Sequence, residues 1–155
     1  TELKALLLEN FSPGAEDFKE RNSVIDAADL AECATLGIEI GNHTATHVHC
    51  GALRPTELRT EIAEARLKLE AMSGSTVRAF SVPYGSERDL TAPVLEAIRE
   101  SGHKAIFLVH GRSNISRMAP DIWYRTSLHN EKPSDLFRKL TIFPLLRTVK
   151  QHLFK

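Results

Sequence analysis

Apolar runs that suit strands alternate with helix-like segments along most of this 155-residue chain, and this alternation limits the fold more than any other feature. The apolar runs lie at 38–42, 77–82, 104–110 and 122–128. Segments with apolar residues at helical spacing separate most of them. Strands that alternate with helices are typical of parallel sheets with helical crossovers. We therefore predict an α/β fold built on a parallel sheet or barrel.

Six helices are expected around these strands, at 1–9, 27–35, 57–72, 92–101, 133–140 and 141–155. Asp26 suits the N-cap of the second helix and Gly37 its C-terminal stop. Four residues of that segment are expected to face inward: Leu30, Ala31, Ala34 and Leu36. Apart from the short first helix, residues 1–23 are expected to be an irregular lead-in or insert. The whole chain, 1–155, has the length of one domain, with 141–155 as its C-terminal helix.

Charge and composition exclude several classes of function. Lys+Arg and Asp+Glu each total 20, so the chain lacks the basic field that gathers phosphates on nucleic-acid-binding proteins. No apolar run approaches the ~20 residues of a membrane span. With only two cysteines, Cys33 and Cys50, we expect free thiols rather than a disulfide framework.

Three of the seven histidines, His43, His47 and His49, stand within seven consecutive positions after the run 38–40. Two or three neutral imidazoles held together suit a zinc-like ion. A metalloprotease helix would need Glu where Thr44 stands, and the β-branched residues of this stretch favour a looping backbone. Two interpretations follow: a metal site at a strand end, or polar loop residues without a metal.

The segment His43-Thr44-Ala45-Thr46-His47 resembles the second motif of the polysaccharide deacetylases, the carbohydrate esterase type 4 family with the NodB homology domain. The resemblance spans about 26–140 and implies a distorted (β/α) barrel. It implies that His43 and His47 bind a divalent metal, most often Zn²⁺, and that Thr44 supports the loop. His49 has no counterpart in the motif and is expected to be a loop residue outside the ligand pair.

Phe80-Ser81-Val82-Pro83-Tyr84-Gly85 resembles the family's third motif, in a branch where another residue, here Ser81, replaces the usual Arg. The resemblance implies that the Tyr84 backbone N–H stabilises a tetrahedral oxyanion. It implies a substrate-binding groove wall that includes Pro83 and Gly85. Arg125 resembles a late arginine of the same branch and is expected to bind substrate. By itself, Pro-Tyr-Gly is also explained by a strand that ends in a turn.

The acidic part of such a site does not occur in the sequence. The family's third metal ligand and general base are aspartates of a Thr-Phe-Asp-Asp-Gly segment, and neither Asp-Asp nor Asp-Gly is present here. We therefore expect the first strand or strands to lie upstream of residue 1. His129 is a candidate general acid near the family's last strand, with His110 as a rival, and both also suit a surface role. His103 and His152 are expected to be surface residues.

The resemblance implies a metal-dependent hydrolase that removes N- or O-acetyl groups from a carbohydrate, provided that an upstream segment supplies the aspartates. A metal-bound water would lose a proton to an upstream Asp and attack the acetyl carbonyl. Two alternatives stay open: a catalytically incomplete carbohydrate-binding or structural remnant of the same fold, and a likeness of fold alone. The compartment, cytoplasm or cell envelope of a bacterium, is left open as well.

Overall fold

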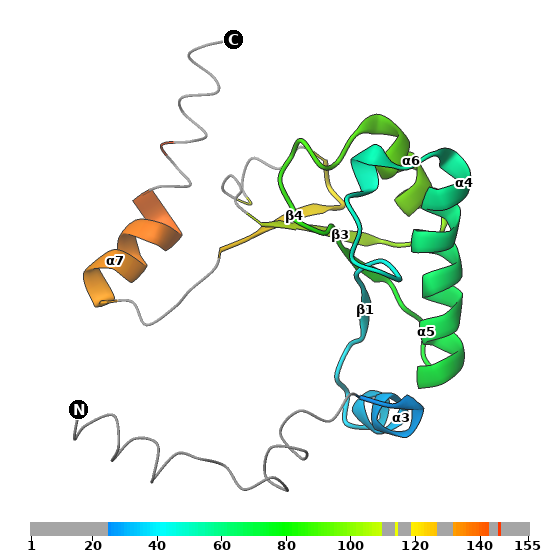
Figure 1. The fold of residues 1–155 in the computed structure, drawn as a ribbon. Helices are drawn as coiled ribbons and strands as arrows, with labels where there is room; N and C mark the ends of the chain where they lie inside the picture. The colour runs from blue at the N-terminus through cyan, green and yellow to red at the C-terminus, as the bar shows by residue number, and fades with distance from the viewer. Residues whose placement is uncertain (1–24, 110–113, 115–118, 127–131, 143–145, 147–155) are drawn as a thin grey trace, which may run out of the picture.

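Four parallel strands form one sheet in the computed structural model, which describes residues 25–109, 114, 119–126, 132–142 and 146. The strands pair in chain order, β1-β2-β3-β4, and every pairing is parallel. Their bounds are Gly41–Asn42 (β1), Ala79–Ser81 (β2), Ala105–Val109 (β3) and Ile122–Arg125 (β4). The predicted parallel α/β fold is confirmed. Within the described residues the sheet is open, with β1 and β4 at its edges (Figure 1).

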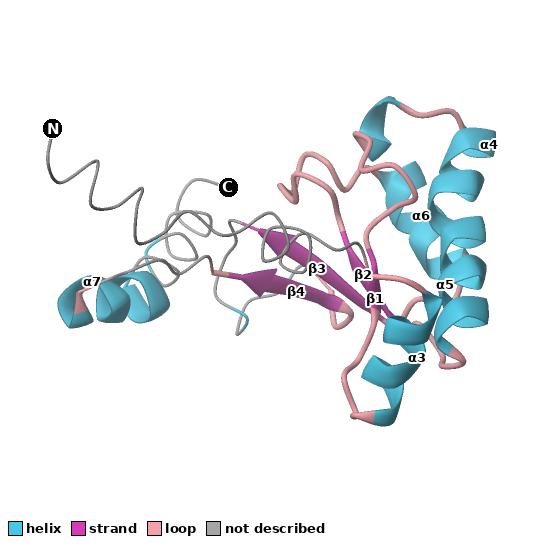
Figure 2. Cartoon of the chain, turned by 60° about the horizontal axis from the view of Figure 1, so that its bottom comes forward, coloured by secondary structure: helices cyan, strands magenta, loops and turns pink. Residues whose placement is uncertain are grey.

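Helices fill most of the connections. They are α3 (Ala27–Thr35), α4 (Pro55–Leu58), α5 (Ala65–Ser73), α6 (Ala92–Glu100) and α7 (Pro133–Phe137). A π-helical segment, η2 (Arg59–Glu64), joins α4 to α5, a second one, η4 (Arg138–Ile142), follows α7, and a short 3-10 turn, η1, spans Cys50–Ala52. Helices α4, α5 and α6 lie together on one side of the sheet (Figure 2). Among the described residues, no helix has the length and apolar character needed to cross a membrane.

The predicted helices at 27–35, 57–72, 92–101 and 133–140 are all present, with ends that differ by a few residues. The predicted helix at 1–9 and the lead-in 1–23 lie outside the described residues. So does most of the predicted C-terminal helix at 141–155. Both cysteines are free thiols, as predicted.

The first described helix, α3, begins and ends at the residues that local sequence signals predicted. The Asp26 carboxylate accepts hydrogen bonds from the N–H groups of Ala28 and Asp29, and Asp29 caps in return. Gly37 follows with φ of +75°, the left-handed conformation that ends a helix. The predicted cap and stop are both confirmed.

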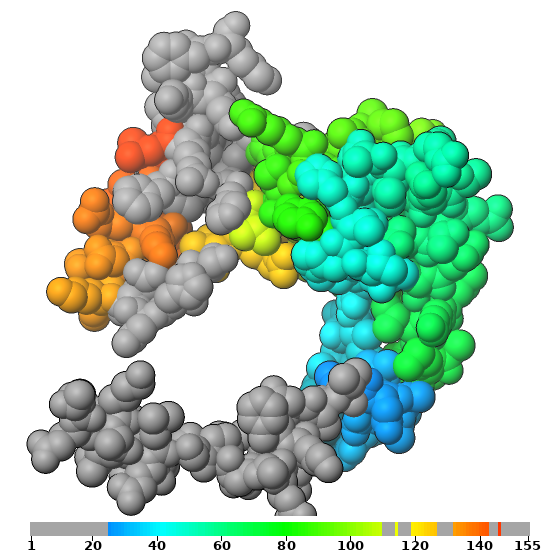
Figure 3. Space-filling model, in the orientation of Figure 1, coloured from blue at the N-terminus to red at the C-terminus, as the bar shows by residue number. Residues whose placement is uncertain are grey.

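The predicted inward face of this helix is wrong for two of its residues. Ala31 is exposed and the Leu36 side chain is 69% exposed. Helical spacing groups apolar residues on one face but does not provide an element to cover that face. Within the described part of the chain, α3 packs mainly against α5. The segment from α3 to β1 forms a narrow column below the main body (Figure 3).

One apolar core lies between the sheet and the helices. Its fully buried members include Phe80, Ile106, Leu108 and Ile122 from the strands and Leu58, Ile62, Val94 and Ile98 from the helical layer. Residues alternate between buried and more exposed along β4, as expected for a strand with one face in the core. The core therefore holds the carboxyl ends of β1, β2 and β4 in fixed relation, which is where the site described next is built.

Candidate functional site

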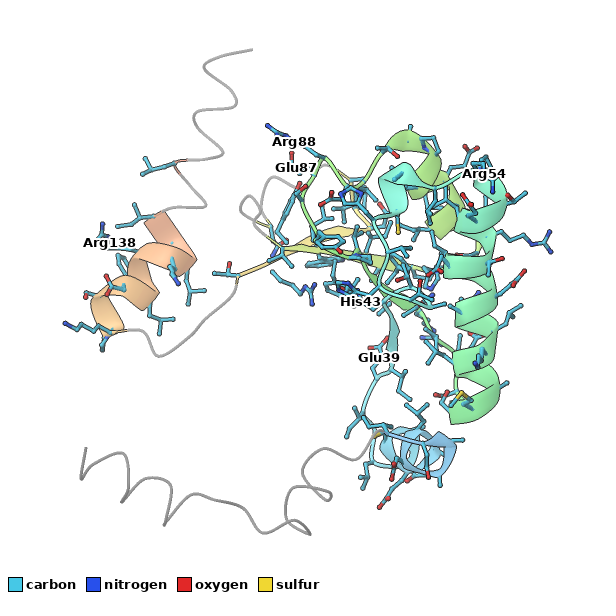
Figure 4. The ribbon with its side chains drawn as sticks, in the orientation of Figure 1. Glu39, His43, Arg54, Glu87, Arg88 and Arg138 are labelled. Atoms are coloured by element: carbon cyan, nitrogen blue, oxygen red, sulfur yellow. The ribbon has the colours of Figure 1, made fainter. Side chains whose placement is uncertain are left out.

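His43 directly follows β1, at the carboxyl edge of the sheet, and Figure 4 shows it above Glu39 on the segment that passes through the strand. Its Nδ1 atom lies 2.7 Å from the carbonyl oxygen of Ser81, the last residue of β2. A carbonyl oxygen only accepts, so Nδ1 is the donor in this contact, and in the neutral form of the ring the lone pair is on Nε2. An imidazole oriented through one nitrogen in this way is prepared to bind a metal through the other.

His47, the second predicted ligand, lies against His43. The two ring centroids are 4.8 Å apart and the rings meet edge to face at 77°. The backbone between them turns sharply, because Thr44 and His47 both have positive φ, 66° and 58°. The N–H of His47 donates to the Thr44 hydroxyl at 3.0 Å, so Thr44 supports the loop as the motif implied.

The donor set fits a divalent cation in part. Two neutral imidazoles, one with its tautomer assigned by a backbone carbonyl, are borderline ligands of the kind that zinc prefers. A catalytic zinc has three protein ligands, however. Within the described ranges, no group of three or more His, Cys, Asp or Glu side chains is placed to hold an ion. His43 and His47 would supply two of the three protein ligands that such a site needs.

The turn after β2 presents Tyr84 to solvent. Pro83 and Gly85 are buried, whereas Tyr84 is 60% exposed, so the side-chain surface of this turn comes from the tyrosine. Tyr84 and Gly85 both have positive φ, 61° and 66°. No acceptor is recorded for the Tyr84 N–H among the described residues, as an oxyanion donor requires. The Tyr84 ring lies 5.3 Å from the ring of His47.

Gly85 is the residue of this turn that tolerates least change. A Cβ at Gly85 would lie 2.8 Å from the Val109 backbone nitrogen, whereas the same test at Gly74, which has a similar φ of +67°, finds open space. Gly74→Ala is expected to cost about 1–2 kcal/mol for the left-handed backbone alone. Gly85→Ala is expected to cost a further ~1–3 kcal/mol, because the methyl group meets backbone atoms of β3. Urea unfolding of the two variants measures the difference, and equal losses would show that the turn shifts to make room.

Arg125, at the end of β4, reaches the same edge of the sheet. Its Nη2 donates to the Ser81 hydroxyl at 2.6 Å, while the Ser81 carbonyl accepts from His43. The structure thus brings together the serine that replaces the motif arginine and a late arginine 44 residues further along the chain. His129, the predicted acid, and its rival His110 lie outside the described residues, as does His152.

His49 pairs with a carboxylate that the sequence analysis did not single out. The His49 Nε2 atom is 2.8 Å from Asp89 Oδ1, and the ring stacks on Tyr84 with centroids 5.3 Å apart. Burial opposes ionisation of Asp89, but hydrogen bonds from Ser86 and the neighbouring His49 outweigh it and hold the pKa of Asp89 below its usual value. His49 is half-exposed and makes its polar contact with Asp89. His49 and Asp89 lie 40 positions apart, and local sequence patterns do not predict a contact over that separation.

Asn42 and His103 form a buried polar pair beneath the histidine loop. The Asn42 amide nitrogen donates to the Ile62 carbonyl at 2.9 Å and lies 3.3 Å from His103 Nε2. Its oxygen accepts from the Thr44 N–H at 3.1 Å. The prediction of His103 as a surface residue is wrong, because this ring is only 3% exposed. The His103 ring also contacts Ser101, whose hydroxyl lies 2.7 Å from His103 Nδ1.

Folding stability is expected to fall in mild acid because of His103. Burial lowers the pKa of His103 from 6.5 to about 4. The unfolded chain therefore binds a proton that the folded chain does not between those values, and stability falls as pH drops from about 6.5 to about 4. Between pH 7.5 and pH 5 the loss attributable to this group is about 2 kcal/mol. Urea unfolding at both pH values, compared with His103→Gln, checks this, since the variant lacks the contribution.

Comparison with known proteins identifies relatives of the fold and of the sequence. Residues 16–106 match the family model described as polysaccharide deacetylase. Among curated proteins, none matches the chain. A polysaccharide deacetylase from Bacillus cereus is similar in structure, with a TM-score of 0.62 at 19% identity over 75% of this chain and 36% of that one. The deacetylase PplD of Streptococcus pyogenes, in complex with acetate, gives a TM-score of 0.61 at 16% identity over 79% and 54%.

A de-N-acetylase from Aggregatibacter actinomycetemcomitans shows the same likeness, with a TM-score of 0.62 at 15% identity over 77% of this chain and 54% of that one. This chain thus spans between 36% and 54% of the length of these three proteins. At these identities the structural matches establish the shared fold, which is the NodB type that the sequence resemblance implied. The family model covers more than half of the chain, including both histidines and the Pro83–Gly85 turn, and on this ground the chain belongs to the polysaccharide deacetylase family.

Proposed function

We propose that this chain carries the histidine part of a metal-dependent site that removes N- or O-acetyl groups from a carbohydrate. The observation that carries the proposal is the orientation of His43, whose Nδ1 is held by the Ser81 carbonyl at 2.7 Å while the His47 ring stands 4.8 Å away. Family membership and the strand-end position of the pair support the same conclusion.

His43 and His47 would hold the cation, most often Zn²⁺. A cation held there would act as a Lewis acid toward an acetyl carbonyl and lower the pKa of a bound water. The Tyr84 N–H would donate to the developing oxyanion, because it has no acceptor among the described residues and its backbone conformation is set by its buried neighbours Pro83 and Gly85. Those two neighbours would shape the groove wall through Tyr84 rather than contact the sugar themselves.

Arg125 would contribute to binding substrate beside the pair, since it and His43 both contact Ser81. Its guanidinium is anchored on Ser81, which leaves further N–H donors for sugar hydroxyl or carbonyl oxygens. His129 remains a candidate general acid. The proposal also requires an acidic residue from outside this chain as general base and third ligand, because no Asp-Asp or Asp-Gly pair occurs here.

A second candidate function is a catalytically incomplete carbohydrate-binding or structural form of the same fold. It is favoured by the donor set, since no three metal-ligating side chains converge among the described residues. The two candidates differ in one respect that can be measured. The enzyme needs an acidic residue supplied from elsewhere in the full-length protein, and the incomplete form has none.

Acetate release by the full-length protein decides between them. The assay uses an N-acetylated and an O-acetylated sugar polymer, with protein as purified, after treatment with a chelator, and after addition of Zn²⁺. The deacetylase predicts release that the chelator abolishes and Zn²⁺ restores. Carbohydrate binding without release in all three preparations supports the incomplete form. Release that persists after complete metal removal contradicts the proposed chemistry.

A further inference from the structure

The backbone of the histidine loop is held in a conformation that it does not prefer. Thr44 and His47 have φ of 66° and 58°, and neither is a glycine. Positive φ is uncommon for any residue with a side chain and is an outlier for a β-branched one such as Thr44. Each such residue costs on the order of 1–3 kcal/mol and persists only where surrounding groups hold it. The loop therefore needs contacts from outside itself.

The π-helical segment η2 supplies contacts of this kind. The predicted helix at 57–72 was expected to be regular, but its backbone widens to a π-helix over Arg59–Glu64. Two carbonyls of this segment reach the loop region: the Glu61 oxygen accepts from the Ala45 N–H at 3.2 Å, and the Ile62 oxygen accepts from the Asn42 amide at 2.9 Å. Single π-helical turns inside α-helices are frequent at functional sites.

The side chain of Glu61 makes the more specific contacts. Its Oε2 accepts from the N–H groups of Ala45 and Thr46, both at 3.0 Å, and its Oε1 accepts from the Thr46 hydroxyl at 2.8 Å. All three donors belong to the segment between His43 and His47. One carboxylate thus ties the middle of the loop to the helical layer, while Asn42 ties its beginning.

We propose that Glu61, presented by the π-helical segment, is a positioning residue that presets His43 and His47 for metal binding without being a ligand. This inference rests on the proposed metal site. Glu61 acts through hydrogen-bond acceptors at a fixed place and not through its charge. A glutamine can offer its amide oxygen to the two backbone N–H groups and its amide nitrogen to the Thr46 hydroxyl, which is also an acceptor. Glutamine should therefore replace Glu61, and alanine should not.

The test compares Glu61→Ala and Glu61→Gln in the full-length protein. Glu64→Gln is the matched control, because Glu64 lies on the same π-helical segment, is exposed, and has no recorded partner in the described part of the chain. The first readout is Zn²⁺ affinity, measured by competition with a chromophoric chelator. Loss of a group that orients metal ligands typically weakens affinity about 10–100-fold. We expect that loss for Glu61→Ala, and a change of no more than about threefold for the other two variants.

The second readout needs no metal. In chelator-treated protein, amide hydrogen exchange at Ala45 and Thr46 is expected to be at least about tenfold faster in Glu61→Ala than in the parent, and close to the parent in Glu61→Gln. Unchanged exchange in Glu61→Ala overturns the positioning role. So does faster exchange with an unchanged Zn²⁺ affinity, because the loop would then be held for folding alone.

The outcomes separate this inference from the proposed function. If the parent protein binds no Zn²⁺, the proposed metal site is wrong, and the role proposed for Glu61 is wrong with it, whatever the exchange data show. A parent that binds Zn²⁺ but releases no acetate leaves the positioning role intact and removes only the deacetylase. An equal loss of affinity in Glu61→Ala and Glu61→Gln shows that charge, not position, is the contribution of this residue.

Discussion

Replacing His43 or His47 by alanine is expected to weaken Zn²⁺ binding by on the order of a hundredfold, and to abolish acetate release by the full-length protein. Structural zinc sites with four protein ligands bind with ~10–16 kcal/mol, or about 3 kcal/mol for each ligand, which corresponds to that factor. His43→Ala also removes the contact with the Ser81 carbonyl, but the ring lies at an exposed strand end, so the fold is expected to persist. Circular dichroism confirms folding, and chelator competition gives the affinity.

His49→Ala is the matched control for zinc affinity, since His49 belongs to the same loop as His43 and His47. Its Nε2 is engaged by Asp89 at 2.8 Å, and its ring lies on Tyr84 rather than against His43. Zinc affinity in this variant is expected to stay within about threefold of the parent. A loss in His49→Ala as large as that in His43→Ala would show that the ligand pair has been assigned to the wrong histidines.

A large loss of folding stability outside the apolar core is expected for Asn42→Ala. Asn42 is completely buried. Its amide nitrogen donates to the Ile62 carbonyl and contacts the His103 ring, and its amide oxygen accepts from the Thr44 N–H. Truncation removes the hydrogen-bond partner of these groups, which costs about 1–3 kcal/mol for a buried group left unsatisfied. It also creates a cavity. We expect the free energy of unfolding to fall by about 3–4 kcal/mol. Urea unfolding at pH 7.5 measures it.

A double-mutant cycle with His103→Ala tests the reason for this loss. If Asn42 and His103 satisfy one another, the two substitutions are not additive, and the coupling is expected to be about 1 kcal/mol. Strict additivity would show that Asn42 acts through Ile62 and Thr44 alone. The cycle is run at pH 7.5, where His103 is neutral because burial lowers its pKa to about 4.

Sequence patterns predicted the order and type of the elements because those signals are local. An apolar run, an N-cap such as Asp26 and a stop such as Gly37 act within a few residues, so helices and parallel strands were placed correctly. The ends were less accurate. The strand predicted at 38–42 has ladder pairing only at Gly41–Asn42, because a strand is defined by its partner β2 and not by its own apolar residues.

The candidate ligand pair was visible in the sequence, since two histidines four residues apart follow a predicted strand. What surrounds the pair was not. Asn42 meets Ile62 and His103 across 20 and 61 positions, so no local pattern predicts that His103 is buried. The π-helical segment that contains Glu61 is not visible in the helical period of 57–72.

The sequence by itself thus determined the α/β class, the order and type of the elements, and the position of two candidate metal ligands. Only the tertiary structure decided how those ligands are oriented: through the Ser81 carbonyl on His43, the Glu61 carboxylate on the loop, and the buried Asn42 beneath it. The physical reason is that periodicity and capping are properties of neighbouring residues. Hydrogen bonds between distant segments form only after the core has packed and brought their ends together.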